Sequence, residues 1–179
     1  MKRASGAKMV ASQGDTEALR SGLQLSYGKG QSEARFPAVK VDRVVRDGDT
    51  VSLAAVTLTA HLTPGHTKGC TTWTMPVSDG AKSYRVVFDC STTVAGNQLV
   101  NNPKYPQILD DYGQSFEILR NLPCDIFLAP HPEFFRMDEK LERLKAGSKD
   151  AFVDTGELKQ FVAQSEQDFQ EELSRQKKN

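Results

Sequence analysis

The segment Thr63-Pro64-Gly65-His66-Thr67-Lys68-Gly69-Cys70-Thr71-Thr72-Trp73 connects two stretches with the pattern of β-strands. Residues 56–62 alternate apolar and polar side chains, and residues 71–77 form a second predicted strand. Pro64 and Gly65 bend the chain between them, which places His66 at the ends of both strands. Loops at strand ends are where scaffolds commonly carry their chemistry. The segment therefore predicts a sheet with a histidine at one edge.

The flanking sequence predicts a layered α/β domain. Strands are expected at residues 8–11, 84–88 and 125–129 and in a meander over residues 39–63; helices are expected at 15–20, 106–122, 138–145 and 155–173. Asp15 stands where it would cap the first helix. Residues 22–37 read as a surface loop, and residues 174–179 are expected to fray. This order suits helices packed on one face of a mixed sheet.

The helix expected at residues 106–122 carries an apolar stripe at three- and four-residue spacing. Its members are Ile108, Leu109, Tyr112, Phe116, Leu119 and Leu122.

Composition narrows the function classes. The 179 residues are most simply one domain, 1–179, with 23 basic and 23 acidic side chains and a formal net charge of zero. That balance argues against a nucleic-acid-binding face and a polybasic membrane anchor, and no apolar run approaches the ~20 residues of a spanning helix. No apolar segment follows the first charged residues, so the sequence as it stands has no signal peptide. The protein is then cytoplasmic if Met1 is the true start.

The other two histidines differ in setting. His61 shares a strand face with Thr57 and Thr59, which indicates a hydrogen-bonded strand histidine without a chemical role. His131 follows the buried strand at 125–129 and stands between Pro130 and Pro132. Neutral imidazole is a common zinc ligand, so His66 and His131 are candidate ligands. The residues alone leave a structural role open for both.

Four stretches together resemble the metallo-β-lactamase superfamily. Residues 63–69 are similar to its T-P-G-H-T-x-G motif, and Cys70-Thr71-Thr72-Trp73 is similar to the third subclass of class B β-lactamases. Residues 87–93 and 122–131 resemble the same subclass, and the likeness runs from about residue 8 to residue 173. The resemblance implies an αββα sandwich and a periplasmic zinc hydrolase that opens the β-lactam amide with a zinc-bound hydroxide. Glyoxalase-II-like thioester hydrolysis is a competing activity within the superfamily.

The resemblance assigns roles to particular residues. His66 matches a ligand of the first zinc and His131 a ligand of the second, while Ser91 and Thr93 match hydroxyls near the substrate, Ser91 helping to recruit its carboxylate. Cys70 and Cys90 match positions that can form a disulfide, or at least lie at bridging distance. The resemblance also implies that Cys124 is a free buried thiol, because the cysteine with which it often pairs is absent from the last helix.

The sequence departs from the family at its defining motif. His-x-His-x-Asp-His, which supplies four further ligands, occurs nowhere in the 179 residues. We therefore expect an incomplete sandwich, comprising the C-terminal half and a short part of the N-terminal half, with weak zinc binding and impaired turnover. The alternative is a catalytically inactive remnant that persists by association with a partner chain or with itself through the exposed sheet.

Overall fold

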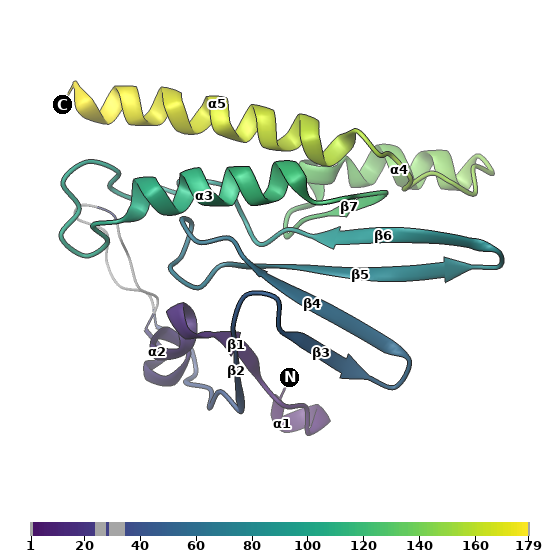
Figure 1. Ribbon diagram of the computed structural model, residues 1–179, viewed down its shortest axis with the longest axis horizontal. Helices are drawn as coiled ribbons and strands as arrows, with labels where there is room; N and C mark the ends of the chain where they lie inside the picture. The colour runs from purple at the N-terminus through teal and green to yellow at the C-terminus, as the bar shows by residue number, and fades with distance from the viewer. Residues whose placement is uncertain (1, 24–27, 29–34, 179) are drawn as a thin grey trace.

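The computed structural model describes residues 2–23, 28 and 35–178 and is built on a five-stranded sheet (Figure 1). Its strands lie in the order β3-β4-β5-β6-β7. Their bounds are β3 Thr50–Leu53, β4 Val56–Leu62, β5 Thr71–Asp79, β6 Lys82–Phe88 and β7 Ile126–Leu128. The first four pair antiparallel as a meander, and β7 joins β6 in parallel after a helical crossover. The predicted strands at 71–77, 84–88 and 125–129 are confirmed with small shifts of their ends. Most of the loop expected at 22–37 falls outside the described residues.

A small N-terminal unit lies beside this sheet (Figure 1). It contains α1 (Lys2–Ser5), β1 (Val10–Ser12), α2 (Gln13–Ser21) and β2 (Arg43–Val45), and β1 and β2 pair in parallel. Residues 43–45 were expected in the meander, but they pair with β1 instead of β3. Asp42 helps to hold this arrangement, since its carboxylate accepts a hydrogen bond from Met9 N at 2.7 Å and forms an ion pair with Lys2.

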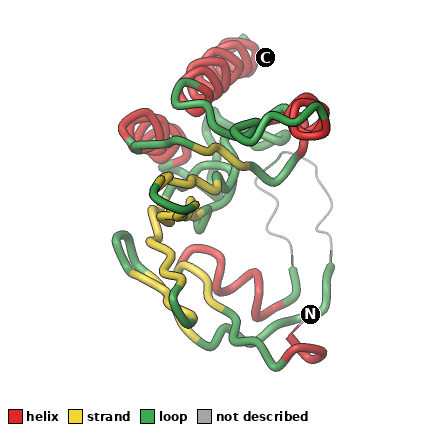
Figure 2. The backbone as a smooth tube through the Cα atoms, turned by 90° about the vertical axis from the view of Figure 1, so that its right-hand side faces the viewer, coloured by secondary structure: helices red, strands yellow, loops and turns green. Residues whose placement is uncertain are grey.

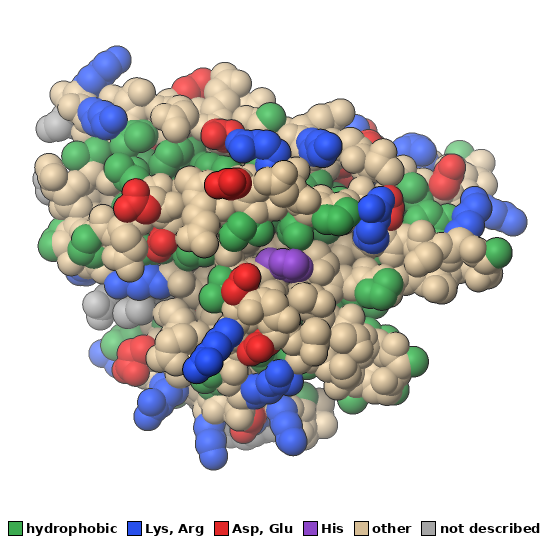
Figure 3. All heavy atoms as spheres, in the orientation of Figure 1, with side chains coloured by type: hydrophobic (Ala, Val, Ile, Leu, Met, Phe, Trp, Pro, Cys, Tyr) green, Lys and Arg blue, Asp and Glu red, His purple; other side chains and the backbone are tan. Residues whose placement is uncertain are grey.

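The helices α3 (Ile108–Asn121) and α5 (Glu157–Lys177) run side by side over the part of the sheet formed by β6 and β7 (Figures 1 and 2). Phe169 of α5 packs on Tyr112 and Phe116 of α3, with ring centroids 4.8 and 5.6 Å apart. Figure 3 shows a band of apolar side chains between the two helices. The core beneath them includes Val87 and Phe127 of the sheet. No helix in the described ranges is long and apolar enough to cross a membrane.

Two details of the helices differ from the sequence-based expectation. Leu109 was assigned to the buried stripe of α3, but it is 37% exposed because the contact surface is narrower than the apolar stripe. The expected fraying at residues 174–179 is also wrong for most of this stretch, since α5 continues to Lys177. Gln176 holds the last turn by accepting a hydrogen bond from Leu99 N and donating one to Asn97 O.

The second face of the sheet is also apolar. Strand alternation and register place Val87 and Phe127 on the face that packs against the helices. The same register places another set on the opposite face, which we call the outer sheet face: Val51, Leu53, Val56, Leu58, Trp73, Met75 and Val77. Leu53, Val56 and Val77 are 83%, 46% and 36% exposed. The outer sheet face is therefore as apolar as a protein core, but several of its side chains are exposed to solvent.

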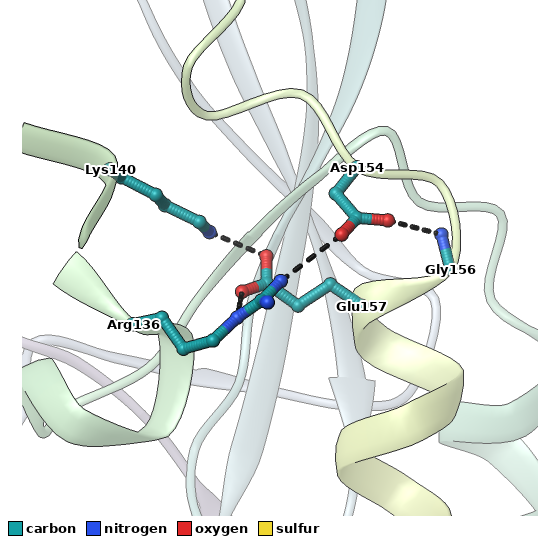
Figure 4. Close-up of polar contacts among 5 residues, drawn as sticks. All are labelled: Arg136, Lys140, Asp154, Gly156 and Glu157. Carbon is teal, nitrogen blue, oxygen red and sulfur yellow. Dashed lines mark hydrogen bonds and ion pairs between the residues drawn. The ribbon is translucent and has the colours of Figure 1, made fainter. Parts of the chain in front are cut away.

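A buried ion pair anchors the start of α5. Lys140 of α4 (Met137–Lys145) places Nζ 2.5 Å from Glu157 Oε2, and only 2% and 5% of the two side chains are exposed. Arg136 bridges Glu157 and Asp154 at 3.3 and 3.1 Å (Figure 4). The 3₁₀ helix η1 (Pro132–Phe135) begins directly after His131, and Arg136 is its C-cap residue. The cluster therefore joins η1, α4 and α5.

We expect Glu157→Gln to lower the free energy of unfolding by about 3–5 kcal/mol, because it leaves the Lys140 ammonium buried without a compensating charge. Glu166→Gln is the matched control, since Glu166 lies in the same helix and its ion pair with Arg120 is 42% and 49% exposed. That substitution should cost about 0–1 kcal/mol. Urea unfolding followed by circular dichroism measures both. Equal losses in the two variants would contradict the structural weight given to the buried pair.

Candidate active site at the sheet end

Four strand ends meet at one end of the five-stranded sheet. Leu62 pairs with Thr71, Trp73 with Phe88, and Phe88 with Leu128. The chain therefore leaves β4, enters β5, and leaves β6 and β7 at the same end. The loop with His66, the loop with Ser91 and Thr93, and the segment with His131 all follow from these strand ends. The strand pairing thus gathers segments that are far apart in the sequence.

A disulfide joins two of these loops. Cys70 and Cys90 are linked, with their Cα atoms 5.6 Å apart, as the resemblance implied. Cys124 is a free buried thiol, also as implied. The disulfide connects the end of the His66 loop to the residue before Ser91. It therefore limits how far the two loops can separate.

The imidazole of His66 is oriented by Thr93. Its Nδ1 lies 2.8 Å from the carbonyl oxygen of Thr93 and 3.1 Å from the Thr93 hydroxyl. A carbonyl oxygen only accepts, so Nδ1 carries the proton and Nε2 keeps its lone pair. Metal-ligating histidines typically donate their second ring nitrogen to a backbone carbonyl or a carboxylate in this way. His66 is therefore in the tautomer that leaves Nε2 able to bind a metal.

The backbone of the His66 loop is held from the side of α3. Ser115 donates to Pro64 O at 2.5 Å, and the buried Asn97 donates to His66 O at 3.0 Å. The ring of Tyr112 leaves no room for a side chain at Gly65, whose φ is +136°, and the Tyr112 hydroxyl donates to Thr93 O at 2.8 Å. Burial raises the pKa of Tyr112 above its usual range. The sequence placed Tyr112 only in the helix core and did not single out Asn97 or Ser115.

Asp15 belongs to this region and does not cap its helix. Its carboxylate accepts hydrogen bonds from Thr67 Oγ1 at 3.0 Å and Gly69 N at 3.1 Å, directly after His66. The start of α2 has no side-chain cap. The expectation that Asp15 caps the helix is therefore wrong, because the loop takes both carboxylate oxygens.

His131 is displayed on the surface. It is the residue before η1, 62% of its side chain is exposed, and its ring lies edge-on to Phe134 at 5.1 Å. Its Nδ1 is 4.0 Å from a Glu133 carboxylate oxygen. His61 instead bonds Thr74 Oγ1 at 2.9 Å within the sheet, and burial lowers its pKa. This agrees with the prediction that His61 is a hydrogen-bonded strand histidine.

Ser91 and Thr93 bond one another. Their hydroxyl oxygens are 3.0 Å apart, and Thr93 N donates to Ser91 Oγ at 3.3 Å. Ser91 is 9% exposed. The pair therefore forms a continuous polar strip with the His66 imidazole through the Thr93 hydroxyl.

Metal ligands are too few for a closed site among the described residues. No group of three or more His, Cys, Asp or Glu side chains gathers there in a metal-binding arrangement. A catalytic zinc keeps three protein ligands and a water. The two histidines at the sheet end supply part of such a donor set, and by themselves they do not fit a zinc ion.

Comparison with known proteins gives one consistent result. No protein-family model matches the sequence. BJP-1, a subclass B3 metallo-β-lactamase of Bradyrhizobium japonicum, is 42% identical, with a TM-score of 0.90 over 98% of this chain and 66% of that one. Native FEZ-1 metallo-β-lactamase from Legionella gormanii is 39% identical, with a TM-score of 0.92 over 99% and 69%. The class B3 di-zinc enzyme LRA-12 from an Alaskan soil metagenome is 27% identical, with a TM-score of 0.85 over 95% and 65%. The chain spans about two thirds of the length of these structures.

A buried aspartate, Asp89, directly follows strand β6. Asp89 is 6% exposed, and Thr72 Oγ1 donates to its Oδ1 at 3.2 Å. Its Oδ2 has no hydrogen-bond partner among the described residues. Burial raises the pKa of Asp89 to about 6, against the hydrogen bonds that lower it. The folded protein therefore holds this proton at pH values where an unfolded chain releases it.

We expect Asp89 to make stability fall as pH rises from about 4 to about 6. Below this window Asp89 is protonated in both states; above it, the folded state carries a buried carboxylate, which costs on the order of 1–3 kcal/mol. Asp89→Asn removes the titration, so the difference in unfolding free energy between wild type and variant should change across this window. Urea unfolding at several pH values measures that difference. A flat difference would contradict the raised pKa.

Proposed function

Because this chain belongs to the metallo-β-lactamase family and resembles its subclass B3, we propose that it is part of a zinc-dependent hydrolase that opens the β-lactam amide. In such a site His66 and His131 would each contribute one ligand to a zinc ion, and a zinc ion with a full ligand set would supply Lewis acidity for hydrolysis. The observation that carries the proposal is the bond from His66 Nδ1 to Thr93 O, which leaves Nε2 at the strand ends with its lone pair free for a metal.

Within this proposal, His66 is a ligand of the first zinc and His131 of the second. The strand pairing that brings both segments to one end of the sheet supports the assignment. Ser91, which is only 9% exposed, recruits the substrate carboxylate through a water, and Thr93 lines the same strip. The Cys70–Cys90 disulfide supports function in an oxidising compartment such as the periplasm.

We expect the 179-residue chain by itself to bind zinc weakly and to hydrolyse nitrocefin poorly or not at all. Two imidazoles cannot supply the free energy that a full set of deprotonated ligands provides. Adding an N-terminal segment that carries His-x-His-x-Asp-His should restore chelator-sensitive turnover. Isothermal titration with zinc and nitrocefin absorbance measure the two properties.

In the extended protein, His66→Ala and His131→Ala should each remove most of the gained turnover, at least ~10- to 100-fold. His61→Ala is the matched control, because His61 bonds Thr74 inside the sheet, and it should keep most of the activity. Strong chelator-sensitive turnover by the 179-residue chain alone would show that the ligands are misassigned.

The outer sheet face supports a second proposal, that the chain persists as an inactive remnant through self-association. Its apolar side chains span neighbouring strands, and contiguous exposed apolar surface of this kind commonly marks a protein interface. Burial of such a face against a second copy removes its apolar area from water. Both proposals predict little turnover by the isolated chain, and this one predicts self-association in addition.

We expect the isolated chain to associate in a concentration-dependent way. Leu53→Lys should raise the apparent Kd by about tenfold or more, because burying a leucine contributes about 1.5–3 kcal/mol. Leu144→Lys is the control, since Leu144 is 49% exposed on α4, away from this face. Sedimentation velocity over a range of concentrations gives the result. A monomer at every concentration, or equal effects of both variants, would exclude the outer sheet face as the interface.

A further inference from the structure

The N-terminus of α2 uses its capping side chains on a distant loop. Ser12 is the N-cap residue and Asp15 lies in the first turn, in the spacing of a capping box, yet neither side chain caps the helix. A helix without such a cap is typically less stable. Both side chains instead reach residues more than fifty positions away. The side chains at the start of α2 therefore bond this loop and do not cap their own helix.

The contacts converge on the three residues after His66. Ser12 Oγ donates to Gly69 O at 2.6 Å, while Asp15 accepts from Gly69 N at 3.1 Å and from Thr67 Oγ1 at 3.0 Å. Both backbone polar groups of Gly69 are thus bonded to the start of α2. The carboxylate of Asp15 therefore bonds the residues on both sides of Lys68.

Close backbone approach makes this contact specific. A Cβ at Gly14 would lie 2.3 Å from Lys68 O, and a Cβ at Gly69 would lie 2.3 Å from Asp15 N. The two backbones meet with no space for any side chain at either glycine. Small displacements of α2 must therefore move residues 67–69.

Charge connects Asp15 to His66 as well. Burial raises the pKa of Asp15, whereas its hydrogen bonds to Thr67 and Gly69 and the charge of a protonated His66 lower it. The geometry agrees, since the Asp15 carboxylate bonds Thr67, the residue next to His66 in the chain. It makes its hydrogen bonds to the loop and leaves the ring nitrogen Nδ1 to Thr93.

We propose that Asp15, assisted by Ser12, is a positioning residue for His66: it fixes residues 67–69 so that the imidazole keeps Nδ1 on the Thr93 carbonyl and presents Nε2 at the sheet end. Asp15 touches neither substrate nor metal in this role. The N-terminal unit is thereby coupled to the candidate site. The functional meaning of the orientation rests on the proposed hydrolase, but the orientation itself is measurable without zinc or substrate.

The test uses the complete 179-residue chain labelled with ¹⁵N, at about pH 8, where an ordinary imidazole is neutral. Long-range ¹H–¹⁵N correlations report the tautomer of each histidine, and His61 and His131 serve as internal references. In the wild type, His66 should show a single tautomer with the proton on Nδ1. Asp15→Ala should move the His66 nitrogen shifts toward a mixture of tautomers and speed hydrogen exchange of the Gly69 amide by about 10- to 100-fold.

Two further variants separate positioning from charge and from general destabilisation. Asp15→Asn keeps an acceptor for Gly69 N without the charge, and it should retain most of the His66 orientation. Glu17→Gln, on an exposed position of the same helix, should leave both readouts unchanged. If Asp15→Ala does not fold, Thr67→Val removes only one of the bonds and should shift His66 in the same direction by less.

Unchanged His66 nitrogen shifts in Asp15→Ala, or in Thr67→Val where the first variant fails to fold, would overturn the proposal, even if stability falls. A failure of zinc binding or nitrocefin turnover would count against the proposed function and leave this result unaffected.

Discussion

The carbonyl oxygen of Thr93 accepts hydrogen bonds from His66 Nδ1 and from the Tyr112 hydroxyl, both at 2.8 Å. This one acceptor connects the loop after β4, the loop after β6 and the first helix over the sheet. Tyr112 in turn packs on Phe169 of α5, so the bond is tied to the core between the two long helices. The orientation of the candidate ligand therefore depends on the same packing that stabilises the domain.

His66 and His131 are supported very differently. The loop with His66 is held by α3 on one side and by the start of α2 on the other, and a disulfide links it to the loop with Ser91. His131 is mostly exposed and rests on Phe134, while Arg136, directly after η1, bonds Glu157. Within the proposed hydrolase, the candidate ligand of the first zinc is therefore held from several sides, whereas the candidate ligand of the second zinc is largely exposed.

One face of the sheet is covered by helices, and the other face is partly exposed to solvent. Helices cover the face with Val87 and Phe127, whereas the outer sheet face leaves Leu53, Val56 and Val77 substantially exposed. The chain spans about two thirds of the structures that it matches, and its candidate metal site has a partial donor set. The described part of the chain thus carries both an exposed apolar sheet face and a partial ligand set.

The sequence by itself determined the elements whose signals are local. Three such signals are the alternation over residues 56–62, the Pro64-Gly65 turn and the three- and four-residue spacing in residues 108–119, each of which follows from backbone geometry within one short segment. The motif around His66, together with three further stretches, indicated the family. Tertiary structure decided what depends on distant partners. The carboxylate of Asp15 could cap its own helix or bond a loop fifty positions away, and only the docking of α2 on Gly69 selects between them. Likewise Leu109 and Gln176 were misjudged because burial and the last helical turn depend on neighbours from other elements, which periodicity within one segment does not encode.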